Sequence, residues 1–244
     1  MTAESPRRIE LLHTEVRYRV TRSRRLKSVQ LRIDVAHGLE VLLPRRLEGY
    51  DERPLLRRHA RWILERLRRS EARRALGPRA VWTDGGEVPL FGHRCPLTVR
   101  VERDRGRTAA RYRGGRVAVR APIDASPDDL RSAVVALYRA IARETLESRV
   151  AHWSREASVR ARSVTIREQA TRWGSCSGAG RLSFNWRLVI APCEILDYVA
   201  AHEVAHLVHF DHGPEWQGLL DRLMPDWRRW EDWLDRNGEL LYLP

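Results

Sequence analysis

Residues 202–206 read His202-Glu203-Val204-Ala205-His206, and this H-E-x-x-H pattern decides both the expected fold and the expected chemistry. Residues four apart on a helix lie on the same face, so the two imidazoles can reach one metal ion. Glu203 stands next to the first histidine, where it can act on a metal-bound water rather than on the metal itself. The pattern therefore predicts a zinc-binding hydrolase helix with Glu203 as its catalytic group.

The residues before the motif indicate how this helix is buried. Pro192 suits a helix start, and Ile195 and Val199 share one helical stripe with both histidines. We predict a helix from Pro192 to about Phe210 whose ligands point from a buried face into the protein.

A third ligand is expected just beyond this helix, in Asp211-His212-Gly213-Pro214. The Gly-Pro pair turns the chain there, so His212 can return to complete a three-histidine site. Three protein ligands leave a fourth position open for water, which separates catalytic from structural zinc. His209 is a rival third ligand, and it replaces the glycine of the related pattern H-E-x-x-H-x-x-G-x-x-H.

The rest of the chain predicts an α+β fold in two parts. Residues 1–120 are expected to form a basic, β-rich N-terminal region with one helix, and residues 121–244 a zincin-like metallopeptidase domain. Ser126-Pro127-Asp128-Asp129 is a strong helix start, with a serine cap and acids at the positive helix end. The other expected elements are a hairpin over 28–43, a helix from Pro54 to Gly77-Pro78, a hairpin at Gly114-Gly115, a hairpin of Trp173–Ser177 with Leu182–Trp186, helices over Glu215–Met224 and Asp226–Asn237, and a C′ glycine at Gly238.

Charge is unevenly distributed between these two parts. Residues 1–120 hold 30 Lys+Arg and 14 Asp+Glu, whereas residues 121–244 hold 15 and 18. The basic N-terminal half is either a solvated arginine-rich surface or a contact surface for nucleic acid or another acidic partner. No helix-turn-helix signal, zinc-finger spacing or aromatic RNA motif accompanies it.

The cysteines and the apolar stretches bear on the location of the protein. Cys95, Cys176 and Cys193 form no C-x-x-C pair, which favours a reducing cytosol over a disulfide framework. The N-terminus lacks the apolar core of a signal peptide, and no apolar run reaches the ~18 residues of a membrane span. We therefore expect a cytoplasmic protein without membrane segments.

Several further motifs resemble one family. Thr171-Arg172-Trp173-Gly174-Ser175-Cys176-Ser177 precedes Leu182–Leu188, the H-E-x-x-H helix and His212, and Pro225-Asp226-Trp227 follows. In this order the motifs resemble the YgjP-like metallopeptidases, relatives of the SprT-type zincins. The resemblance implies that His202, His206 and His212 bind zinc and that Glu203 is catalytic. His212-Gly213-Pro214-Glu215-Trp216 departs from the usual His-Ser-x-x-Phe-Trp of the family.

The expected reaction is hydrolysis of peptide bonds by a zinc-activated water, with Glu203 as general base and then general acid. The oxyanion also requires stabilisation, for which Arg172, Tyr198, Arg187 and His209 are candidates. Two other functions remain open: hydrolysis of a non-peptide amide, and nucleic-acid binding by the basic N-terminal half beside a structural zinc site.

Overall fold

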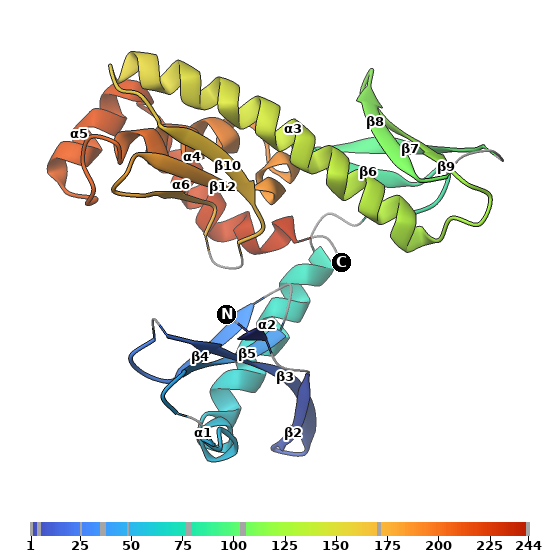
Figure 1. Ribbon diagram of the computed structural model, residues 1–244, viewed down its shortest axis with the longest axis vertical. Helices are drawn as coiled ribbons and strands as arrows, with labels where there is room; N and C mark the ends of the chain where they lie inside the picture. Colours follow the sequence, from blue (N-terminus) through green and yellow to red (C-terminus); the bar gives the residue numbers. More distant parts are fainter. Residues whose placement is uncertain are drawn as a thin grey trace. The chain divides into compact units, whose positions relative to one another are not determined.

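The computed structural model describes residues 2–3, 6–24, 26–34, 38–47, 49–76, 80–102, 106–169 and 172–242. It contains two compact units, residues 1–77 and residues 78–243 (Figure 1). Each unit has its own apolar core. The expected mixture of helices and small sheets is confirmed.

Unit 1 is a five-stranded sheet with helices packed on one of its faces. The strand order is β1-β3-β5-β4, and β2 pairs with β3 on its own. Strands β3 and β5 run parallel, and the other pairs are antiparallel. Alternate residues of β3, such as Val16, Tyr18 and Val20, are buried against the helices. The elements are β1 Thr2–Ala3, β2 Arg7–Leu11, β3 Thr14–Ser23, β4 Gln30–Asp34, β5 Gly38–Pro44, α1 Arg53–Arg58 and α2 Ala60–Leu76.

Two of the elements predicted from the sequence, a hairpin and a helix, lie in unit 1. The hairpin over 28–43 is confirmed, since β4 pairs antiparallel with β5; residues 35–37 of its turn lie outside the described residues. The single helix predicted from Pro54 is instead two helices that meet at His59, whose ψ of 15° leaves the helical region. Neither glycine nor proline marks this break in the sequence. The predicted stop at Gly77-Pro78 lies outside the described residues.

Unit 2 contains two sheets and four α-helices in its described residues. One sheet has the order β6-β7-β9-β8 and the other the order β10-β12-β11. The elements are β6 Glu87–Leu90, β7 His93–Val101, β8 Ala109–Arg113, β9 Arg116–Ala121, α3 Pro127–Glu156, β10 Ser163–Arg167, β11 Gly174–Cys176, β12 Arg181–Asn185, the 3-10 helix η1 Trp186–Ile190, α4 Cys193–Ala205, α5 Pro214–Leu223, α6 Trp227–Asn237 and the 3-10 helix η2 Gly238–Leu241.

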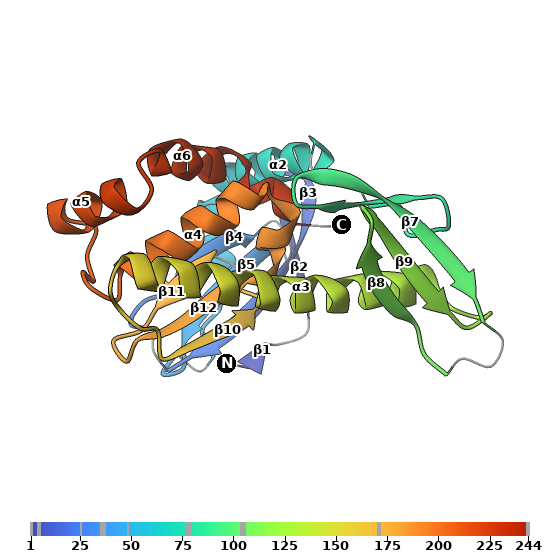
Figure 2. The same ribbon diagram turned by 90° about the horizontal axis from the view of Figure 1, so that it is seen from above.

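The long helix α3 packs against both sheets of unit 2 (Figures 1 and 2). Its start is as predicted: the Ser126 hydroxyl accepts from the Asp129 N–H, and the Asp129 carboxylate accepts from the Ser126 N–H, a reciprocal capping box. Farther along, Tyr138 donates a hydrogen bond to the carbonyl of Pro89 in β6, and Arg149 pairs with Asp197 of α4. One helix therefore fixes the first sheet and the metal-motif helix in a common core.

The two parts do not divide where the composition changes. The expected boundary near residue 121 falls inside unit 2, and the chain divides into its compact units after residue 77 instead. The reason is that β6–β9 bury apolar side chains such as Leu97 and Val117 in the same core as α3 and α4. The change in net charge near residue 121 reflects residues at the surface, and it does not mark the boundary of the apolar core.

The end of α6 also differs from the prediction. Gly238 was expected to close the helix as its C′ residue, but its φ is −55° and the chain continues into η2. A side chain at Gly238 would begin 3.0 Å from Nε1 of Trp173. The glycine is explained by the close approach of this indole rather than by backbone conformation.

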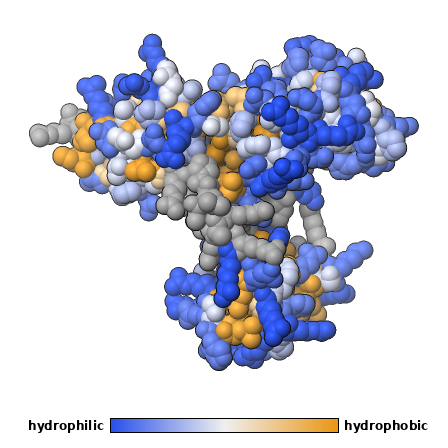
Figure 3. Space-filling model, turned by 180° about the vertical axis from the view of Figure 1, so that it is seen from behind, coloured by the Kyte–Doolittle hydropathy of each residue, from blue (hydrophilic) through white to orange (hydrophobic). Residues whose placement is uncertain are grey.

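Hydrophilic side chains cover most of the surface visible in Figure 3, in line with the 32% of charged residues. Across the described ranges, the helices fall short of the length or the apolar character that crossing a membrane demands.

Candidate metal centre

The metal-motif helix is held in place from its N-terminal side. Asn185 at the end of β12 is fully buried, and its amide joins two segments: Oδ1 accepts from the N–H of Arg187, and Nδ2 donates to the carbonyl of Gln169. The chain then passes through η1 to Pro192, which precedes α4. Because Ile195 and Val199 on this helix are buried, α4 is fixed in rotation as well as in position.

Three histidines meet at the C-terminal end of α4. His202 lies in its last turn, His206 directly follows its last residue, and His212 precedes α5. The Nε2 atoms of the three rings form a triangle with sides of 3.1, 3.2 and 3.3 Å. Zinc–nitrogen distances of about 2.0–2.1 Å and tetrahedral angles place two ligand nitrogens about 3.3 Å apart. The triangle therefore has the dimensions of a three-histidine metal site.

The chain between the second and third histidines decides which third histidine joins the cluster. The helix predicted to reach Phe210 ends at Ala205, because the N–H groups of Leu207 and Val208 bond to carbonyls only three residues back. The tighter turn points the His209 carbonyl at Nδ1 of His206, 3.0 Å away. The His209 ring lies instead 3.4 Å from the Glu215 carboxylate. His209 thus supports a cluster histidine through its backbone and does not replace His212.

The protonation of the cluster suits metal binding. Burial lowers the pKa of His202 to about 3, helped by the nearby rings of His206 and His212, and burial also lowers the pKa of His206. Neutral imidazoles are the form that binds metals. Nδ1 of His206 faces a carbonyl, so it carries the proton and leaves the lone pair on Nε2.

A chain of side chains orients His202 in the same way. The Tyr198 hydroxyl lies 3.3 Å from Nδ1 of His202 and donates to the Glu231 carboxylate, also at 3.3 Å. Burial and the neighbouring carboxylate raise the pKa of Tyr198, which keeps the phenol protonated. The phenol oxygen can then accept a hydrogen bond from the Nδ1–H group of His202, so the lone pair of Nε2 again faces the cluster. Groups of this kind fix the tautomer and the direction of metal-binding histidines.

Trp216 of α5 forms the floor of the cluster. Its side chain is buried, and its ring centroid lies 4.8, 5.4 and 4.7 Å from the rings of His202, His206 and His212. Trp227 packs edge-on against Trp216 from α6. Both tryptophans are buried and serve in packing beneath the histidines.

Glu203 follows His202 in the same helix and lies against strand β11. It is buried, and its Oε2 has no hydrogen-bond partner among the described residues. Burial raises the pKa of Glu203 to about 8, against the opposing effect of Arg172. A buried carboxyl group without a partner is costly unless a cation or a water supplies one. The chemistry of this donor set therefore fits a divalent ion with a water beside Glu203.

Gly174 makes room for this carboxylate, a role not predicted from the sequence. A Cβ atom at Gly174 would lie 2.4 Å from Oε1 of Glu203 and 2.6 Å from its Cγ. The sequence carried a signal in the glycine of Trp173-Gly174-Ser175-Cys176, because glycine is unfavourable inside a strand and often marks a close approach.

Of the four candidates for oxyanion stabilisation, three are engaged elsewhere. Tyr198 contacts His202 from behind the cluster, and the His209 ring pairs with Glu215. Arg187 is buried, pairs with Glu168 at 2.6 Å and stacks over Trp186. Arg172 is exposed and acts electrostatically on the Glu203 carboxylate, so it remains a candidate.

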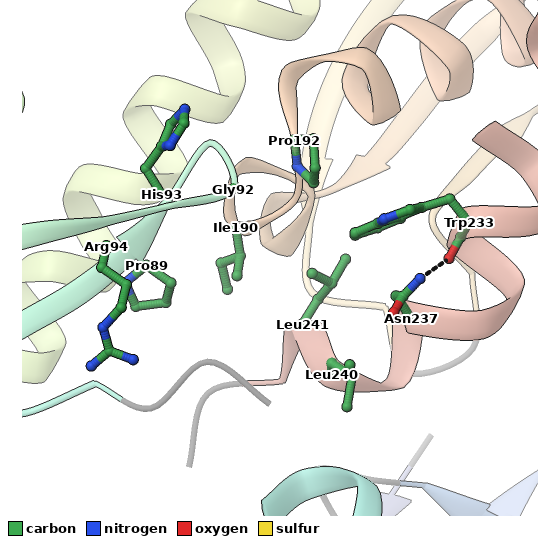
Figure 4. A pocket seen from close by; sticks show the side chains of 10 residues that line it. All are labelled: Pro89, Gly92, His93, Arg94, Ile190, Pro192, Trp233, Asn237, Leu240 and Leu241. Carbon is green, nitrogen blue, oxygen red and sulfur yellow. Dashed lines mark hydrogen bonds between the residues drawn. The ribbon is translucent and has the colours of Figure 1, made fainter. Parts of the chain in front are cut away.

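An apolar pocket of about 220 Å³ lies at the opposite end of α4 (Figure 4). Pro192 at the start of the helix lines it together with Ile190, Trp233 and Leu241. Since α4 has 13 residues, about 20 Å of helix separates this pocket from the histidines. The pocket is therefore distinct from the candidate metal centre.

A helix that presents two histidines around a buried glutamate, with a third histidine from the following turn, defines a metallopeptidase type of site. The comparison with protein families agrees: the model of the YgjP-like metallopeptidase domain matches residues 27–237. The chain belongs to the YgjP-like metallopeptidase family, as the sequence motifs indicated. No curated protein gives a significant sequence match.

Proposed function

We propose that this protein is a zinc-dependent peptidase, with His202, His206 and His212 as ligands and Glu203 as its catalytic residue. The observation that carries the proposal is the triangle of Nε2 atoms 3.1–3.3 Å apart beside a buried carboxylate that lacks a partner. Zinc bound there would polarise the scissile carbonyl and lower the pKa of a coordinated water to about 7.

Glu203 supplies the proton transfers. Its carboxylate accepts a proton from the attacking water and then donates it to the nitrogen of the departing amine, so the residue ends in its starting state. Burial raises the pKa of Glu203, so its side chain can hold the proton between these two steps. Arg172 is the candidate of this chain that stabilises negative charge on the substrate.

Strand β11 is the proposed binding edge for the substrate. It is the edge strand of the order β10-β12-β11, and Gly174 brings it against Glu203. An extended peptide can pair with such an edge through main-chain hydrogen bonds, which give affinity with little sequence preference. This geometry favours a peptide over a small non-peptide amide.

The number of ligands supports catalysis over a structural role. In the described part of the chain, the cluster offers three protein ligands, whereas structural zinc sites use four. A structural site would also give no reason to bury a carboxylate next to the ligands.

Metal analysis of the purified protein, combined with casein and peptide cleavage, tests the proposal. Wild type should contain about one zinc ion per chain and cleave, while Glu203→Gln should keep the zinc and lose at least about 100-fold in rate. Glu194→Gln on the exposed first turn of the same helix is the matched control and should cleave like wild type. Full activity of Glu203→Gln would refute the mechanism.

A further inference from the structure

The sheet β6-β7-β9-β8 has two very different faces. Residues such as Leu97, Val117 and Val119 point inward to the core that α3 shares. Because side chains alternate along a strand, the intervening residues point to the opposite face. There, strands β7, β9 and β8 carry six exposed arginines: Arg94, Arg100, Arg111, Arg113, Arg116 and Arg120.

The register of the strands places these arginines side by side. Arg100 of β7 is directly opposite Arg120 of β9, and Arg116 of β9 is opposite Arg113 of β8. Directly paired residues have Cβ atoms about 5 Å apart, and like charges in such pairs destabilise a sheet. The fold thus retains two repulsive pairs on one small surface, an arrangement that an anionic partner would relieve.

Acidic residues of the protein do little to neutralise this face. Arg94 pairs with Glu87 of β6 at 2.5 Å, and Arg120 pairs with Glu102 at 3.6 Å. The other four arginines have no ion pair with any described residue. The open face of the sheet in unit 1 is different, because Arg32 pairs there with Glu40 and Arg8 with Glu15. Acidic side chains are thus interspersed with arginines on the first sheet, whereas strands β7, β9 and β8 contain no acidic residue.

Small side chains lie among the arginines at the centre of the face. Thr98, Ala118 and Arg111 lie in one row across the strands, and Ala109 lies beside Arg120 in the next. No leucine, isoleucine, valine, methionine or aromatic side chain belongs to this face of β7, β9 and β8. Protein partners usually require apolar or aromatic anchors at the centre of an interface, and this face offers none.

We propose that the outer face of β7, β9 and β8 binds the phosphate backbone of nucleic acid. Arginine presents a planar fork of donors that matches phosphate oxygens, and the small central residues let a backbone approach the sheet. Without aromatic groups or a protruding helix the face reads no bases, so binding is independent of sequence. The site belongs to the same compact unit as the metal centre, and it does not depend on the proposed peptidase activity.

The salt dependence of binding gives the size of the effect. Four phosphates neutralised by four free arginines predict a slope of log K against log salt of about −3.6 for duplex DNA. Between about 50 and 200 mM salt, the affinity should then fall by about 100-fold from this contribution.

The experiment is fluorescence anisotropy of a labelled duplex of about 20 base pairs, titrated with the full chain over this range of salt. The face variant is Arg100→Gln/Arg111→Gln/Arg113→Gln/Arg116→Gln. The matched control removes four exposed arginines of unit 1 as Arg57→Gln/Arg58→Gln/Arg61→Gln/Arg66→Gln, which gives the same change in net charge.

In the face variant, the slope of log K against log salt should be less negative by about 3.6, and the control variant should keep most of its slope. Thermal unfolding of the face variant should be unchanged or higher, because repulsive pairs are removed. If that variant does not fold, the single reversals Arg111→Glu and Arg116→Glu should each weaken binding. Equal losses in both quadruple variants would show binding by overall charge and overturn the proposal. Displacement of the duplex by polyglutamate at equal charge concentration would overturn it in favour of an acidic protein partner.

Discussion

Gly174→Ala tests the arrangement of Glu203, the proposed catalytic residue, without changing a proposed metal ligand. The new Cβ would lie 2.4 Å from Oε1 of Glu203, whereas ordinary contacts begin at 3.4 Å. The carboxylate or the strand must therefore move by about 1 Å. A displacement of this size at a reacting group can cost about 100-fold in rate, and the forced contact about 1–3 kcal/mol in the free energy of unfolding.

The assay for Gly174→Ala combines kcat/KM on a quenched peptide, zinc content and thermal unfolding. We expect the zinc to be retained, because the three ligands lie on other segments, and kcat/KM to fall by about 100-fold. Gly178→Ala in the adjacent turn is the control: its Cβ would meet nothing within 4 Å, so its stability and activity should match wild type. A Gly174→Ala protein with wild-type kcat/KM would refute the inferred contact with Glu203.

Three further perturbations follow from the structure. Tyr198→Phe removes the acceptor for the Nδ1 proton of His202, so zinc affinity measured by chelator competition should fall about 10- to 100-fold, and an unchanged affinity would exclude the orienting role. Chelation of the metal should abolish cleavage and lower the free energy of unfolding by about 2.7 kcal/mol relative to protein with free zinc at 100 times its Kd; denaturant titrations with and without zinc measure this difference. Gly86→Ala places a Cβ 2.2 Å from the backbone oxygen of Val81 and should cost at least about 2 kcal/mol, so a chemical denaturation midpoint like that of wild type would contradict the packing at this turn.

Features that depend on local sequence were predicted well. The capping box at Ser126 depends on residues within three positions, and the hairpin at Gly114-Gly115 depends on two glycines, whose φ values are 58° and 76°. The convergence of His202 and His206 also follows from helical spacing alone. In each case a short stretch of chain contains the whole physical cause.

Features that depend on contacts between distant segments were missed. The apolar pattern of the sequence continues to Phe210, but α4 ends at Ala205. The turn that follows is required to bring His212 back to His206. The role of Gly174 requires knowledge that β11 passes Glu203, a contact between residues 29 positions apart in the sequence. The boundary near residue 121 was wrong because charge composition reports on solvent-facing residues.

The continuous helix α3 has a practical consequence for dissecting this protein. A fragment that starts near residue 121 would keep the histidines. It would expose the side of α3 that β6–β9 cover and remove the Pro89 carbonyl, the partner of the buried Tyr138 hydroxyl. Such a fragment would be prone to aggregate in expression trials whatever its chemistry. A soluble catalytic core should be sought by removing unit 1, residues 1–77, and keeping the sheet β6-β7-β9-β8 together with α3 and the histidines.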